Sequence, residues 1–121
     1  MKTPTYLIAV LLAAATVVHS PAWAHAALAS AEPANNAILA TSPTTITLRF
    51  NEKLEGNFSS IKVMDAAGQA VTTQKAVLDV ADPKILHVAL PALQGGKYSV
   101  QWTAIGHDGH RRTGDYTFSV K

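Results

Sequence analysis

The sequence predicts an all-β domain, either an immunoglobulin-like or cupredoxin-like Greek-key sandwich or a flattened barrel, of about seven to nine strands. Apolar and polar residues alternate strictly in several short segments. Residues that favour turns separate these segments, and no stretch after residue 24 shows a long helical period. Alternation with a period of two indicates strands that bury one face and expose the other. Its recurrence at short intervals is typical of antiparallel sheets.

The expected strands are placed by this alternation. Residues 45–50 read Thr-Ile-Thr-Leu-Arg-Phe, so Ile46, Leu48 and Phe50 share one face. Residues 69–78 alternate less regularly and suggest one or two shorter strands. The same strict pattern predicts further strands over 59–64, 86–90, 98–104 and 115–120. The apolar residues expected inside them are Ile61, Val63, Leu86, Val88, Leu90, Tyr98, Val100, Trp102, Ala104, Tyr116, Phe118 and Val120.

Turn-forming residues bound these strands. The run Gln94-Gly95-Gly96-Lys97-Tyr98 before a strand resembles the tyrosine corner of immunoglobulin-like sandwiches. The chain contains no internal repeat and no linker, so a single domain is expected after the N-terminal segment. The other turn signals lie at 33–36, 42–43, 65–68 and 82–84.

Residues 1–24 are predicted to be a cleaved export signal. Lys2 gives a positive start, residues 7–18 are apolar, and Ala22-Trp23-Ala24 provides an A-x-A cleavage site. The apolar run is shorter than the about 20 residues that span a bilayer, which favours a signal peptide over a membrane anchor. Cleavage after Ala24 leaves an exported β-domain of residues 25–121 that begins at His25.

Composition excludes several classes of function. The chain contains no cysteine, which excludes disulfide scaffolds, thiolate zinc sites, cysteine nucleophiles and iron–sulfur clusters. Ten Lys and Arg residues against eight Asp and Glu residues give a net charge of +2. This charge is small, and Arg111-Arg112 is the only pair of adjacent basic residues, so no nucleic-acid partner is expected.

Histidine is the unusual residue of the predicted domain. Once it is N-terminal, His25 offers its α-amine and its ring Nδ1, which can close a chelate on one metal ion. The second cluster, His107-Asp108-Gly109-His110, follows a predicted strand. In an extended chain the side chains of Asp108 and His110 point the same way, about 6.5–7 Å apart. A carboxylate and an imidazole at that spacing can converge on one ion.

Together these groups provide three nitrogens and one carboxylate oxygen. A tetragonal set of nitrogen and oxygen ligands suits Cu(II), which also leads the affinity order of divalent ions. Zn(II) is the main competitor, although it prefers tetrahedral sites. The residues alone leave the choice between these two metals open.

Further elements complete a family pattern. With them, residues 25–121 resemble the CopC/PcoC-type periplasmic copper-binding domain, a Greek-key β-barrel or cupredoxin-like sandwich. The resemblance implies one Cu(II) per domain, bound by His25, Asp108 and His110, and no catalytic residues. The elements are the His25 start, Ser30-Ala31-Glu32-Pro33, Leu48-Arg49-Phe50-Asn51-Glu52, Asp82-Pro83-Lys84, residues 96–102, Asp108-Gly109-His110 and residues 114–120.

The resemblance also implies a role. This is copper resistance or homeostasis in the periplasm, by sequestering the copper ion or delivering it to an inner-membrane CopD-type copper transporter. The mature chain is expected to bind without catalysis and without inserting into the membrane.

The sequence departs from some members of that family. Met64 is the only methionine after residue 1, so no Met-rich site for Cu(I) is expected. His107 is expected to be an exposed loop residue and Glu52 a solvated carboxylate at a strand end, with a supporting role at the metal left open for both. His87 is out of phase with the apolar residues of its strand and is expected to face solvent or to pack on the sheet.

Two other functions are consistent with parts of the sequence. A copper oxygenase with an N-terminal histidine brace also uses an N-terminal histidine and a second histidine. Against it, Asp108 as an anionic ligand occupies an equatorial position that oxygen needs. The other alternative is an immunoglobulin-like interaction module that binds no metal.

Overall fold

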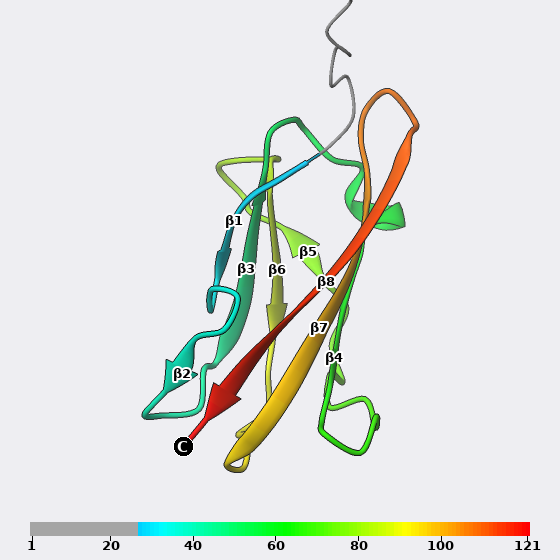
Figure 1. Ribbon diagram of the computed structural model, residues 1–121. Coiled ribbons are helices and arrows are strands. Elements are labelled where there is room, and N and C mark those ends of the chain that lie inside the picture. Colours follow the sequence, from blue (N-terminus) through cyan, green and yellow to red (C-terminus); the bar gives the residue numbers. More distant parts are fainter. Residues whose placement is uncertain (1–26) are drawn as a thin grey trace, which may run out of the picture.

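Two four-stranded sheets face each other in the computed structural model, which describes residues 27–121 (Figure 1). The β1 sheet has the strand order β1-β3-β6-β5, and the β8 sheet has the order β2-β8-β7-β4. All neighbouring strands are antiparallel except β2 and β8. The strands are β1 (Leu28–Glu32), β2 (Ile38–Leu39), β3 (Thr45–Phe50), β4 (Ser60–Met64), β5 (Val77–Leu78), β6 (Ile85–Ala89), β7 (Gly96–Ile105) and β8 (Arg111–Val120).

The predicted all-β sandwich is confirmed. Among the described residues the single helical element is a short 3₁₀ turn, η1 (Gly56–Phe58). No helix within residues 27–121 is long and apolar enough to cross a membrane. The predicted signal segment and His25 lie outside the described residues.

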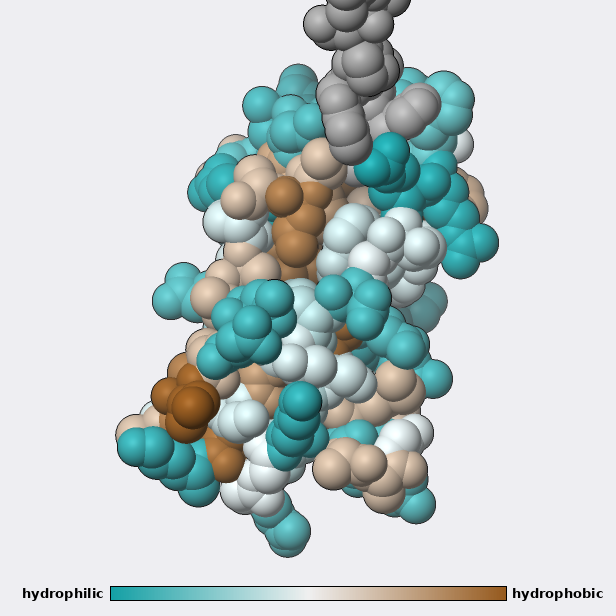
Figure 2. Space-filling view, in the orientation of Figure 1, coloured by the Kyte–Doolittle hydropathy of each residue, from teal (hydrophilic) through white to brown (hydrophobic). Residues whose placement is uncertain are grey.

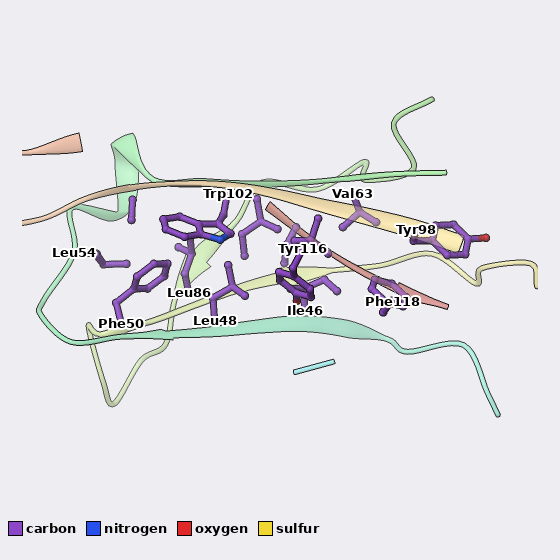
Figure 3. Packing of buried hydrophobic residues seen from close by; sticks show 14 of the residues in the cluster. Ile46, Leu48, Phe50, Leu54, Val63, Leu86, Tyr98, Trp102, Tyr116 and Phe118 are labelled. Carbon is purple, nitrogen blue, oxygen red and sulfur yellow. The ribbon is translucent and has the colours of Figure 1, made fainter. Parts of the chain in front are cut away.

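The core lies between the two sheets, where the alternating strands place their apolar residues (Figure 3). Phe50 of β3 and Trp102 of β7 pack edge to face, with ring centroids 5.2 Å apart. Leu54, which the alternation does not select, is also buried beside them. Leu90 is only half-buried, because β6 ends one residue earlier. All the other residues expected inside are buried.

The tyrosine corner is confirmed: the Tyr98 hydroxyl donates a hydrogen bond to the backbone oxygen of Gln94 at 2.6 Å. The irregular segment 69–78 contains one short strand, β5, and an isolated bridge between Ala70 and Met64. β1 and β2 lack the alternation of the longer strands, because the pairing of β1 shifts register between Leu28 and Ser30 and β2 has only two residues.

Three segments that are distant in the sequence meet at one end of the sandwich. They are the start of β1, the crossover of residues 51–55 after β3, and the turn of residues 106–110 between β7 and β8 (Figure 1). The histidine-containing turn therefore lies at the same end of the molecule as the residues that follow His25.

Candidate metal centre

A tight turn joins β7 to β8 and brings two predicted metal ligands together. Gly106 donates its N–H to the His110 oxygen at 3.2 Å, and Gly109 donates to the Gly106 oxygen at 2.9 Å. Gly109 has φ +79°, a backbone conformation that favours glycine. The turn depends on both glycines: Gly109 supplies the positive φ, and a Cβ at Gly106 would meet the side chains of Glu52 and Asp108.

Within this turn, Asp108 and His110 are in direct contact. Oδ2 of Asp108 lies 3.0 Å from Nδ1 of His110, and Oδ1 accepts the backbone N–H of His110 at 2.9 Å. The extended-chain spacing expected from the sequence is therefore wrong here. The carboxylate caps the turn and so draws the imidazole against itself. His110 remains largely exposed, so a cation can reach the pair.

This pair is not a complete metal site by itself. Among residues 27–121, no three His, Cys, Asp or Glu side chains are grouped so that they could hold a metal ion. His25, the third predicted ligand, lies outside the described residues.

Glu52 reaches the same place from the other side of the sandwich. A Cβ built on Gly106 would overlap Oε1 of Glu52 and would lie 2.9 Å from Oδ1 of Asp108. Oε1 is buried and has no hydrogen-bond partner among the described residues. The expectation of a solvated carboxylate is thus wrong for this oxygen. Two carboxylates converge on Gly106, one of them with a buried oxygen that needs a cation or donor.

The crossover holds the turn in place. Glu55 donates its N–H to the Ile105 oxygen at 2.8 Å, and His107 donates its N–H to the Lys53 oxygen at 3.2 Å. Between them, Leu54 forms an isolated bridge with Gly106. Buried Leu54 fixes this segment in the core, so the position of Glu52 is set by packing and not by the strand pattern.

Buried Ser59 reinforces that connection, and nothing in the alternation of its strand identifies this role. Its hydroxyl donates to the Glu55 oxygen at 2.9 Å and accepts the Ile105 N–H at 3.1 Å. A buried hydroxyl that both donates and accepts costs little to bury. It joins the crossover to the end of β7.

His107 is exposed, as expected. Its side chain contacts Glu55 and not the carboxylates of Glu52 and Asp108. Its Nε2 is 3.6 Å from Oε1 of Glu55. A contact between two exposed side chains at this distance contributes little to stability.

His87 packs on the outer face of the β1 sheet. This is one of the two positions expected for it, the other being a side chain that faces solvent. Its Nδ1 lies 3.1 Å from the Thr47 hydroxyl, and its Nε2 lies 2.9 Å from Oδ1 of Asp79. The hydrogen bond from His87 holds the pKa of Asp79 below its usual value, with the Ala81 N–H as the next cause. Both ring nitrogens of His87 are therefore engaged away from the metal centre.

Hydrophilic side chains surround the end of the molecule that carries the turn (Figure 2). The residues gathered there are carboxylates, an imidazole and backbone groups, a donor set suited to a hard or borderline metal ion.

Comparison with known proteins gives consistent matches. A family model described as the CopC domain matches residues 28–121. Protein YobA of Escherichia coli (strain K12) is 38% identical over 117 residues, which cover 96% of this chain and 93% of that protein.

Two solved structures share the fold. The crystal structure of CopC from Methylosinus trichosporium OB3b has a TM-score of 0.76 at 33% identity and covers 80% of this chain and 94% of that chain. PcoC from Escherichia coli, described as a methionine-rich copper resistance protein, has a TM-score of 0.72 at 33% identity. It covers 81% of this chain and 100% of that chain.

Proposed function

Since this chain belongs to the CopC domain family, we propose that it is a periplasmic Cu(II)-binding protein of copper resistance and homeostasis. Removal of residues 1–24 exposes the α-amine of His25, and the domain of residues 25–121 then takes one Cu(II). It sequesters the ion or delivers it to an inner-membrane CopD-type copper transporter. The protein acts by binding and carries out no catalysis.

The ligands we propose are His25, through its amine and ring, with Asp108 and His110. The contact between Asp108 and His110 supports this assignment, because it presents an oxygen and a nitrogen side by side at an exposed turn. The start of β1, three residues after His25, lies at the same end of the sandwich (Figure 1). Two chain steps extend about 7 Å at most, which limits how far His25 can lie from Ala27.

The observation that carries the proposal is the buried, unpartnered Oε1 of Glu52. An oxygen with negative charge in such a position is unfavourable unless a cation balances it. It converges with Asp108 on Gly106, so a cation bound at Asp108 lies where that charge needs one. We propose that Glu52 supports the ion electrostatically.

The donor set favours Cu(II) over Cu(I). Nitrogen and carboxylate ligands suit Cu(II), whereas thioether ligands select Cu(I). The chain contains two methionines, Met1 and Met64, in contrast to the methionine-rich description of PcoC. Met64 ends β4 and is half-buried against the sandwich, where a flexible side chain fills space.

The test is a Cu(II) titration of protein that begins at His25, beside protein with one alanine added before His25. The extension removes the chelate, and we expect the Cu(II) affinity to fall at least about 100-fold. Loss of a group that only hydrogen-bonds to a metal ligand already costs about 10–100-fold. Asp108→Ala and His110→Ala should each weaken binding. His87→Ala should leave it unchanged, because both nitrogens of His87 are engaged elsewhere. Equal affinities for the two N-termini would overturn the proposed ligand set.

A further inference from the structure

The start of β1 is held by an unusual pair of hydrogen bonds. In an antiparallel ladder, two facing residues exchange two backbone N–H···O bonds. Asn51 makes the first of these, donating its N–H to the Ala27 oxygen at 3.0 Å. The Ala27 N–H, however, donates to the side-chain Oδ1 of Asn51, at 2.6 Å. The Asn51 side chain thus takes the part that a backbone carbonyl plays elsewhere in the ladder.

Because the side chain of Asn51 accepts this hydrogen bond, Ala27 stays paired at the point where the chain leaves the β1 sheet. Directly after β3, residues 51 and 52 bend away from the β1 sheet, and Leu54 reaches Gly106 of the opposite sheet. At this bend the Ala27 N–H bonds to the side chain of Asn51 and not to its backbone carbonyl. Because Oδ1 of Asn51 accepts instead, Ala27 stays paired while Glu52 turns toward the carboxylate of Asp108.

A bulge in β1 separates the Ala27–Asn51 contact from the regular pairing of residues 30–32. Leu28 faces Phe50, but Ser30 faces Arg49, so Ala29 is an extra residue in β1. A bulge bends its strand and interrupts the regular pairing. The pairing of residues 30–32 therefore does not by itself fix the direction of Ala27, which depends on the Leu28–Phe50 pair and on the contact with Asn51.

We propose that Asn51 is a positioning residue for metal capture. It fixes Ala27 and, through it, the N-terminus of the processed chain against the Asp108–His110 turn. This inference rests on the proposed function, since His25 supplies the remaining donors from two residues upstream. In this role Asn51 acts as a positioning residue through its two hydrogen bonds with Ala27. One residue thereby joins the strand that carries the N-terminus to the crossover that carries Glu52.

The experiment uses protein that begins at His25. Asn51 is exposed, so Asn51→Ala should keep the fold, checked by circular dichroism and thermal unfolding. We expect Cu(II) affinity to fall about 10-fold or more, as for the loss of other groups that orient metal ligands. The nitrogen hyperfine pattern in the EPR spectrum of the Cu(II) form should change, because the amine and ring of His25 are no longer held. A merely structural role would leave that spectrum intact.

Three further variants sharpen the result. Asn51→Asp keeps an acceptor oxygen at the same distance and should restore the wild-type EPR spectrum. Asn51→Gln moves the acceptor by one methylene and should alter the spectrum without unfolding the protein. Asn57→Ala is the matched control, an exposed asparagine in η1 at the same end, and should change nothing.

The outcomes separate the two proposals. If wild-type protein binds Cu(II) and Asn51→Ala binds it with equal affinity and an equal spectrum, the positioning role is overturned and the proposed function stands. If wild-type protein with a free His25 does not bind Cu(II), the proposed function fails and the role of Asn51 fails with it.

Discussion

Oε1 of Glu52 lies against the Cα of Gly106, at the position where any other residue would carry its Cβ. Glycine at position 106 is what allows the carboxylate to reach this place. The same glycine begins the turn that presents Asp108 and His110. The two acidic groups of the candidate centre therefore depend on one missing side chain.

Gly106→Ala tests that dependence. The added methyl overlaps Glu52 and crowds Asp108, so one carboxylate must move, and we expect Cu(II) affinity to fall about tenfold or more. The matched control is Gly68→Ala. Gly68 has φ +80° and open space around it, so its substitution should cost about 1 kcal/mol of stability through backbone strain and leave copper binding unchanged. Isothermal titration with Cu(II) and thermal unfolding measure the two effects, and an unchanged affinity in Gly106→Ala would contradict the geometry.

Glu52→Gln should act with opposite signs on stability and on binding. Without metal, the variant removes the negative charge from a side chain whose Oε1 is buried without a partner among the described residues, and its unfolding free energy should rise by up to about 1 kcal/mol. With metal, the lost negative charge should lower Cu(II) affinity about tenfold. Glu55→Gln is the control, since Glu55 is exposed and contacts His107 instead. Chemical unfolding of the apo protein measures the unfolding free energy, and copper titration measures the Cu(II) affinity. A fall in both the unfolding free energy and the affinity would refute the supporting role.

The two buried tyrosines should respond differently to loss of the hydroxyl. Tyr98→Phe removes the hydrogen bond to Gln94, and we expect a loss of about 1 kcal/mol. Tyr116→Phe removes a buried hydroxyl that has no partner among the described residues, and we expect no loss, or a gain of up to about 1 kcal/mol. Denaturant unfolding at pH 7 measures both. Equal destabilisation of the two variants would argue against the assigned partners.

Tyr116 also predicts a dependence on alkaline pH. Burial raises its pKa to about 12, whereas an unfolded tyrosine ionises near its ordinary value of 10.0. Above pH 10 the unfolded state loses a proton that the folded state keeps, so stability falls as the pH rises toward 12. Tyr116→Phe has no hydroxyl to ionise at this position. The unfolding free energy of the variant relative to wild type should therefore rise between pH 10 and 11.5, as measured by denaturant unfolding from pH 9 to 11.5.

Asp79 predicts the corresponding effect in acid. Its folded-state pKa lies below the ordinary value of 3.8, chiefly because His87 donates a hydrogen bond to it. A carboxyl with a lowered pKa stabilises the fold above its unfolded pKa, and that contribution is lost as the pH falls through the folded value. Asp79→Asn should therefore lower Tm at pH 6 to 7, and the difference from wild type should shrink below about pH 4. Copper affinity should not change, since the pair lies on the outer face of the β1 sheet.

The strands of the sandwich could be predicted because alternation is a local property. Alternate residues of a strand point to the same face of the sheet. Ile46, Leu48 and Phe50 therefore share one face, and all three are buried. β1 and β2 could not be identified in this way, because a bulge interrupts the pairing of β1 and β2 has only two residues.

Of the candidate site, the sequence identified Asp108 and His110 as a possible pair, from residue type and spacing. Their direct contact was not predictable, since it follows from the turn that Gly106 and Gly109 allow. The partners of His87 were likewise hidden, because Thr47 and Asp79 come from two other segments of the β1 sheet.

The sequence by itself determined the fold class, the chemistry of the donor residues and the absence of thiol ligands. Only the tertiary structure decided that Glu52 is buried against Gly106 and that Asn51 holds Ala27. The physical reason is that residue pattern records burial along one strand, whereas these contacts arise where the crossover after β3 packs Leu54 into the opposite sheet. A residue's distance from a partner far along the chain is set by that packing and leaves no periodic signal in the sequence.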